Sequence, residues 1–97
     1  MTEDINKIIK HYLIAQPVRK AYLFGSYARA EENSESDIDI LIELEENADL
    51  FQFINIKLEL EKLINKPVDL VSSNGISPRL NPYIDKDKIL IYEKSNL

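Results

Sequence analysis

The chain has 97 residues, contains no cysteine and carries a formal net charge of −5. Its length predicts a single domain over residues 1–97, and the lack of cysteine excludes disulfides and thiolate metal sites. No basic stripe, membrane-spanning run or signal peptide is recognisable, so we expect a cytoplasmic protein without a direct nucleic-acid or membrane partner.

The N-terminal segment predicts an amphipathic helix that begins near Thr2 and ends before Pro17. Thr2 can cap the helix, whereas Pro17 cannot continue it. Apolar side chains recur at helical spacing and share one face, namely Ile5, Ile8, Ile9, Tyr12 and Leu13. The helix therefore offers one apolar side to a core.

The next segment predicts an anion-binding turn between two apolar strands. We expect a strand over 18–24, a short helix over 26–30, an acidic loop over 31–35 and a strand over 38–44. Gly25 allows the backbone to turn tightly and to approach a ligand closely. Ser26 then begins the short helix, where free backbone N–H groups favour an anion.

Two carboxylates stand at the start of the second predicted strand. Alternation along a strand points Asp37 and Asp39 to one side, with Cα atoms about 6.5–7 Å apart, and points Ile38 and Ile40 into the core. Two carboxylates on one face repel each other unless a cation lies between them, and oxygen ligands suit Mg²⁺. The alternative is a pair of surface residues on an amphipathic strand.

The second half of the chain predicts a helix over 49–64, a strand over 68–71, a short helix over 79–85 and a strand over 89–92. Asp69 in the third strand points opposite to Val68 and Leu70. If this strand pairs beside the second strand, Asp69 joins the face of the first two carboxylates; otherwise it is a lone carboxylate near an edge. The long helix is expected to turn most of its apolar side chains inward, namely Leu50, Phe53, Ile54, Leu58, Leu60, Leu63 and Ile64.

These elements predict an α/β (α+β) domain whose mixed sheet of about four strands is flanked by helices. The chain further resembles the minimal nucleotidyltransferases of the polymerase-β-type superfamily. The superfamily signature, Gly-Ser followed after a spacer by Asp-x-Asp, is present as Gly25-Ser26 and Asp37-Ile38-Asp39. The family core reads Phe-Gly-Ser-x-Ala-Arg-Gly and Ser-Asp-Ile-Asp-Leu, and the match is close over residues 18–44. Either half alone would carry little weight, but the combination is specific.

The resemblance implies transfer of AMP from ATP to a hydroxyl group with the help of two Mg²⁺ ions. It implies a third carboxylate in a Pro-Val-Asp-Leu-Val context, which maps onto Asp69. The residues implied as both catalytic and metal-binding are Asp37, Asp39 and Asp69. The residues implied in nucleotide binding are Gly25, Ser26 and Arg29.

Several neighbouring residues leave alternatives open. Arg29 can contact a phosphate or brace Asp37, or it is an exposed helix arginine. Ala30 replaces the last Gly of the family motif and is compatible with a helical backbone there. Tyr27 can touch a base or ribose, or pack into the core. Arg79 can approach the nucleotide or form a surface salt bridge.

The resemblance also implies a partner. Minimal nucleotidyltransferases are paired with a small all-helical HEPN toxin, which is an RNase, and they silence it as type VII-like antitoxins by transferring AMP to a tyrosine. Two alternatives stay open: a nucleotide-binding antitoxin that blocks its partner sterically, and a transferase that acts on a small-molecule hydroxyl.

Overall fold

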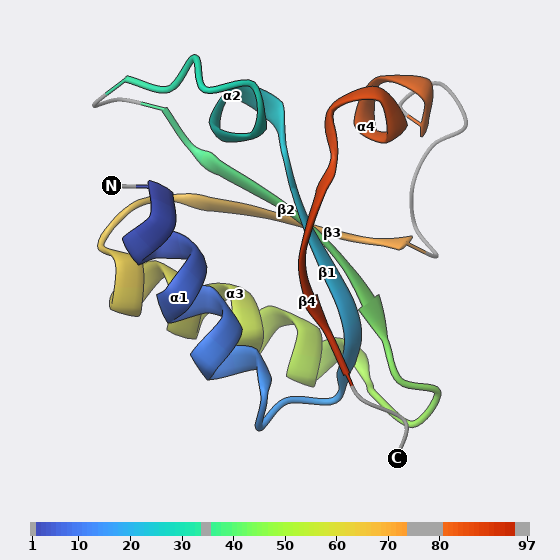
Figure 1. The fold of residues 1–97 in the computed structure, drawn as a ribbon. Coiled ribbons are helices and arrows are strands. Elements are labelled where there is room, and N and C mark those ends of the chain that lie inside the picture. The colour runs from blue at the N-terminus through green and yellow to red at the C-terminus, as the bar shows by residue number, and fades with distance from the viewer. Residues whose placement is uncertain (1, 34–35, 74–80, 95–97) are drawn as a thin grey trace.

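The computed structural model describes residues 2–33, 36–73 and 81–94 and has the fold class expected from the sequence (Figure 1). The elements in chain order are α1 (Thr2–Leu13), β1 (Val18–Phe24), α2 (Gly25–Ala28), β2 (Ile38–Leu44), α3 (Leu50–Ile64), β3 (Val68–Ser72), α4 (Asn81–Asp87) and β4 (Ile89–Glu93). Their bounds agree with the predicted ones within about two residues. Arg79 lies outside the described residues.

The four strands form one mixed sheet with the order β3-β2-β1-β4. β1 pairs antiparallel with both β2 and β4, while β2 and β3 pair parallel. Parallel neighbours need a crossover connection, and α3 supplies it between β2 and β3. The third strand thus pairs beside the second, which is the condition under which Asp69 shares a face with Asp39.

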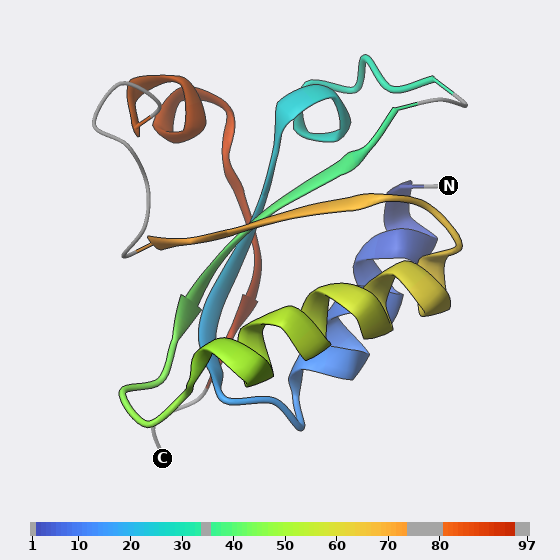
Figure 2. The ribbon, with the colours of Figure 1, turned by 180° about the vertical axis from the view of Figure 1, so that it is seen from behind.

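Among the described residues, helices cover one face of the sheet, and the other face, termed the open face, has no helix on it. α1 and α3 lie together on one face, whereas α2 and α4 lie beyond one end of the strands (Figures 1 and 2). The side chains between the helices and the sheet form the core, which includes Ile9, Leu13, Leu23, Ile38, Ile40, Ile42, Ile56 and Leu60, each no more than 1% exposed. Since Ile38 and Ile40 point into this core, Asp39 between them points to the open face.

α3 departs from the prediction in the direction of its apolar side chains. The helix begins with a capping box between Asp49 and Gln52 and ends at Asn65 in the left-handed region. Leu60 is buried as predicted, and so is Ile56, which the prediction left out. Four residues expected to face inward are instead exposed, namely Leu50, Ile54, Leu58 and Leu63. The helix is apolar almost all round, so periodicity could not identify its buried side.

None of the described helices has the length and apolar composition needed to cross a membrane.

Candidate active site

Gly25 brings the end of β1 against the first carboxylate-bearing strand. Phe24 lies opposite Asp39 in the antiparallel register, and Gly25 turns away from the strand with a φ of +73°. A Cβ atom at position 25 would lie 2.0 Å from the Asp39 Oδ2 atom. Two separate features therefore require glycine at position 25, namely the left-handed backbone and the close approach to Asp39.

Two of the predicted carboxylates, Asp69 and Asp37, lie near enough to Asp39 for their charges to act on it. Asp69 lies directly opposite Asp39 in the parallel register of β2 and β3, so the two side chains share the open face. Asp37 precedes β2 by one residue and is exposed, as is Asp69. Partial burial, followed by the negative charges of Asp69 and Asp37, raises the pKa of Asp39 to about 6. The structure thus concentrates negative charge at one point.

This donor set fits a divalent cation. Oxygen ligands are what Mg²⁺ prefers, and a cation at Asp39 would favour the charged carboxylate, whose pKa is raised first by partial burial and then by repulsion from Asp69 and Asp37. Within the described parts of the chain, no three His, Cys, Asp or Glu side chains lie close enough to hold a metal ion by themselves. Mg²⁺ usually takes one or two carboxylates and completes its shell with water and substrate phosphates. The carboxylates therefore suit a metal that arrives with a triphosphate.

The short helix α2 begins next to this cluster. Its N-cap residue is Phe24, in extended conformation, and no side chain caps the helix start. Half-buried Ser26 stands in the first turn. The alternative roles of Tyr27 are resolved in favour of packing, because its side chain is 5% exposed and belongs to the core.

Arg29 follows α2 and is held by two carboxylates. Its guanidinium donates to Asp87 at 2.8 Å and to Glu31 at 3.1 Å. Asp87 ends α4, so this ion pair connects the two helices beyond the sheet. The positive charge of Arg29 also acts to lower the pKa of Asp39. Nothing in the sequence indicates that Asp87 pairs with Arg29, because the two residues lie 58 positions apart.

Ala30 adopts a left-handed backbone with a φ of +58°. The family motif has Gly at this position, and the prediction that Ala fits applied to a helical backbone. The observed conformation is instead one that disfavours a Cβ atom. The turn after α2 therefore holds a strained residue next to Arg29.

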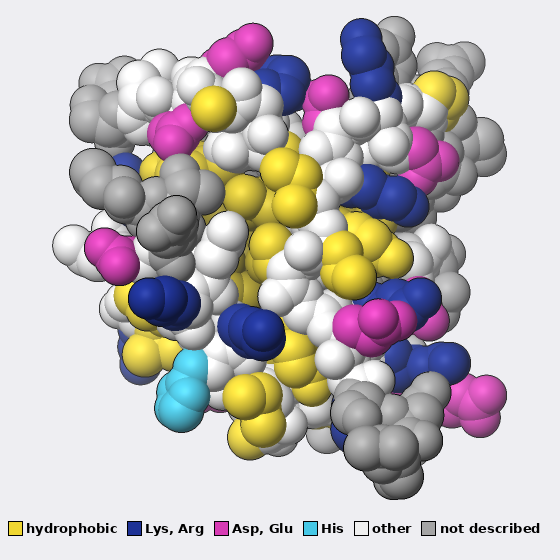
Figure 3. Space-filling view, in the orientation of Figure 1, with side chains coloured by type: hydrophobic (Ala, Val, Ile, Leu, Met, Phe, Trp, Pro, Cys, Tyr) yellow, Lys and Arg dark blue, Asp and Glu magenta, His cyan; other side chains and the backbone are white. Residues whose placement is uncertain are grey.

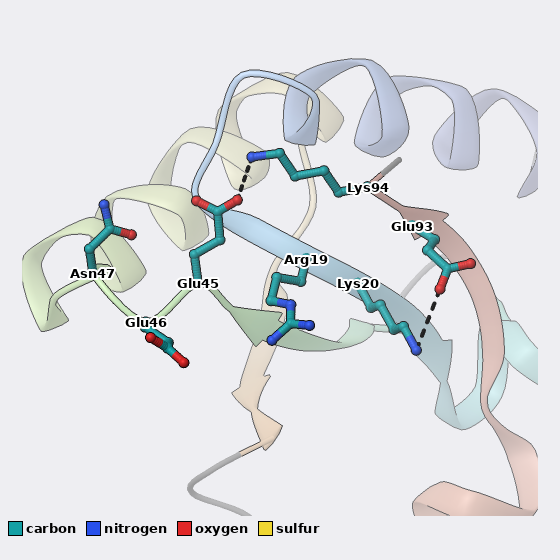
Figure 4. A pocket seen from close by; sticks show the side chains of 7 residues that line it. All are labelled: Arg19, Lys20, Glu45, Glu46, Asn47, Glu93 and Lys94. Carbon is teal, nitrogen blue, oxygen red and sulfur yellow. Dashed lines mark hydrogen bonds and ion pairs between the residues drawn. The ribbon is translucent and has the colours of Figure 1, made fainter. Parts of the chain in front are cut away.

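A separate hollow lies at the opposite end of the sheet. Its volume is about 380 Å³, and Figure 4 shows the lining residues Arg19, Lys20, Glu45, Glu46, Asn47, Glu93 and Lys94. Lys20 pairs with Glu93 at 3.4 Å, and Lys94 pairs with Glu45. These charges neutralise one another, and none of the predicted site residues lines this hollow.

Charged side chains of both signs are interspersed on the face of the molecule that Figure 3 shows. On the face shown in Figure 3, Lys and Arg side chains are scattered among Asp and Glu side chains and apolar patches. A protein that grips nucleic acid usually gathers its positive charge along one track. The face in Figure 3 has no such track.

Comparison with known proteins gives a consistent result. Residues 3–97 match the family described as "Polymerase beta, Nucleotidyltransferase". A candidate protein adenylyltransferase of Methanocaldococcus jannaschii is 41% identical over 87 residues, which are 90% of this chain and 88% of the relative.

Solved structures of similar proteins agree with this family match. A candidate minimal nucleotidyltransferase is 31% identical, covers 90% of this chain and 89% of its own, and superposes with a TM-score of 0.79. A chain from the complex of tri-AMPylated Shewanella oneidensis HEPN toxin with MNT antitoxin is 25% identical, with a TM-score of 0.71, over 97% of this chain and 74% of that one.

Proposed function

The chain belongs to the polymerase-β-type nucleotidyltransferase family, and from this premise we propose that it transfers AMP from ATP to a tyrosine hydroxyl of a HEPN toxin and so acts as an antitoxin. The observation that carries the proposal is the position of Asp39. This carboxylate lies between Asp37 and Asp69 and against the turn at Gly25. We further propose that residues 1–97 form one catalytic domain.

In the proposed reaction, the acceptor hydroxyl oxygen attacks the α-phosphorus of ATP. A new bond forms between phosphorus and the acceptor oxygen, and the bond to the β-phosphate oxygen breaks, so that pyrophosphate leaves. When bound, two Mg²⁺ ions would neutralise the developing charge on the attacking and leaving oxygens. Catalysis of this kind depends on positioning and charge stabilisation more than on covalent chemistry.

The side chains divide this work by their places on the sheet. Asp37 and Asp39 would hold both metal ions and Asp69 the ion beside the acceptor. As the exposed carboxylate on the neighbouring strand, Asp69 is also placed to accept the proton of the hydroxyl. The uncapped first turn of α2, with Ser26, would bind phosphate oxygens through N–H and O–H groups.

Arg29 is proposed to act on the nucleotide from the edge of the site. Its side chain remains 43% exposed while it pairs with Asp87 and Glu31. A guanidinium has five donors, so a phosphate oxygen can be bound while one of these pairs is kept.

The relatives support the proposed acceptor and partner. The M. jannaschii relative bears a protein adenylyltransferase name, and in the S. oneidensis complex the HEPN toxin is AMPylated. Both support a protein acceptor for this chain. A bulky anionic group on a tyrosine near an RNase site would repel RNA phosphates, which gives the modification a means to silence a toxin.

The test is incubation of the chain with a small helical HEPN protein, ATP and Mg²⁺, followed by intact-mass measurement of the HEPN protein. We expect wild type to add one or a few AMP units on tyrosine, and the Asp37→Asn/Asp39→Asn double variant to add none. Asp4→Asn serves as the control, because Asp4 is exposed on α1. A partner that is inhibited but unmodified by wild type would identify a steric antitoxin instead, and transfer only to a small hydroxyl compound would identify a different substrate class.

A further inference from the structure

The outer side of α3 carries a strip of exposed apolar side chains. It consists of Leu50, Phe51, Ile54 and Leu58, which are 67%, 81%, 44% and 51% exposed. In Figure 2, α3 lies on the outside of the molecule. Phe51, Ile54 and Leu58 follow the spacing i, i+3, i+7, which is the spacing of a helix that packs against another helix.

The strip has a protruding end and a hollowed end. Phe51 is the most exposed large apolar side chain among the described residues. A hollow of about 480 Å³ lies at the other end, lined by Asn55, Leu58, Glu59, Glu61, Lys62 and Asn65. Phe51 and Leu58 are close to two helical turns apart, about 10 Å along one side of the helix. A projection and a recess therefore lie in line on the same surface.

Charged side chains flank the strip at both ends, and at the C-terminal end Lys62 lies beside Glu59 and Glu61. Glu46 and Asp49 lie at the N-terminal end and Lys62 lies near the C-terminal end, and all three are exposed. Within the described residues, neither Glu46 nor Lys62 forms an ion pair. An antiparallel second copy of the strip would bring Lys62 of each copy near Glu46 of the other and oppose the two helix dipoles.

We propose that the outer side of α3 is the interface of a homodimer, in which two α3 helices pack antiparallel about a two-fold axis near Ile54. Such an axis places Phe51 of each copy in the hollow of its partner and Lys62 opposite the partner's Glu46. An interface of this kind uses the same patch on both copies and must be self-complementary in shape and charge. One helix pair covers less than the roughly 800 Å² per partner of a standard interface, so the dimer is weak, with a dissociation constant in the micromolar range or above.

Sedimentation equilibrium of the purified chain over a range of concentrations tests the proposal. We expect a reversible monomer–dimer equilibrium for wild type and at least about tenfold weaker association for Phe51→Gln. The matched control is Leu90→Gln, because Leu90 is a 48% exposed apolar residue on β4. Thermal unfolding of each variant shows that the fold is kept. A wild-type chain that stays monomeric at about 1 mM overturns the proposal.

Charge reversal gives a second, independent readout. Lys62→Glu and Glu46→Lys should each weaken association, and the double reversal should restore it, because only an antiparallel arrangement brings these two residues together. Double reversal without recovery would overturn the antiparallel geometry. If wild type alone is monomeric and Phe51→Gln instead weakens binding of a helical partner protein, the strip belongs to that partner and the homodimer is wrong.

Discussion

At the residue scale, Asp39 is expected to combine a catalytic role with a cost in stability. Its raised pKa of about 6 means that the folded protein disfavours the charged carboxylate. Asp39→Asn should therefore abolish transfer and yet increase the free energy of unfolding of the metal-free protein at pH 7. We expect an increase of about 1 kcal/mol, because solvent screens the repulsion at this half-buried group. Thermal unfolding in the presence of a chelator measures it, and Asp4→Asn is the control.

The pH dependence of this effect has a definite sign. A carboxyl whose pKa is higher in the folded than in the unfolded state destabilises the fold above the folded pKa, and the penalty disappears as pH falls toward the unfolded value. The stability difference between Asp39→Asn and wild type should thus be full above pH 7 and vanish near pH 4. A constant difference from pH 4 to pH 8 would contradict the assigned cause.

Asp69 allows nucleotide binding and chemistry to be separated. Asp69→Asn should still bind ATP with Mg²⁺, because Asp37 and Asp39 remain, and should lose transfer by several kcal/mol of transition-state stabilisation. Ser26→Ala should mainly weaken nucleotide binding. Calorimetric titration and single-turnover transfer measure the two quantities. A kinetically silent Asp69→Asn would make this residue structural.

Ala30 is the residue at which a family glycine would improve stability. Its left-handed backbone costs a residue with a Cβ atom about 1–2 kcal/mol, and the greater freedom of unfolded glycine offsets part of the gain. Ala30→Gly is therefore expected to stabilise the protein by about 0.5–1 kcal/mol in urea unfolding. Asn65→Gly is the control, because asparagine already tolerates the left-handed conformation at the end of α3.

At the element scale, the ion pair between Arg29 and Asp87 connects α2 to α4. Both side chains retain contact with solvent, so we expect Asp87→Asn to change stability by less than about 1 kcal/mol. Its effect should appear in the Michaelis constant for ATP, because Arg29 is no longer held in place beside the site. The variant Asp85→Asn, which alters a neighbouring exposed carboxylate paired with Lys88, should leave this constant unchanged.

The elements also show what sequence patterns can and cannot resolve. Alternation in β2 and β3 predicted that Asp39 and Asp69 share a face, and the parallel register confirms it. The inward side of α3 was predicted only in part: Leu60 is buried, and Phe53 and Ile64 pack against the core. The apolar side chains of this helix spread over more of its circumference than the part that is buried, so periodicity could not identify the buried part. The pairing of Arg29 with Asp87 depends on where α4 folds back, and neither residue's surroundings in the sequence indicate it.

At the scale of the whole molecule, the two faces are expected to serve different partners. Asp39 and Asp69 point to the open face of the sheet. α3 lies on the opposite face (Figures 1 and 2). Leu90 pairs with Tyr22 on β1 and is 48% exposed on the open side. An acceptor protein must cover this side to bring a hydroxyl to Asp69, whereas a second copy on α3 would leave it free.

Leu90→Glu should therefore lower transfer to the partner protein while ATP binding stays within about twofold. Phe51→Gln should leave both quantities unchanged, because it alters only the outer side of α3. The measurements are the initial rate of AMP transfer at several partner concentrations and calorimetric titration with ATP. Equal loss of transfer in both variants would mean that the acceptor contacts both faces, or that dimerisation and transfer are coupled. Loss in Phe51→Gln alone would place the acceptor on α3 and remove the division of faces.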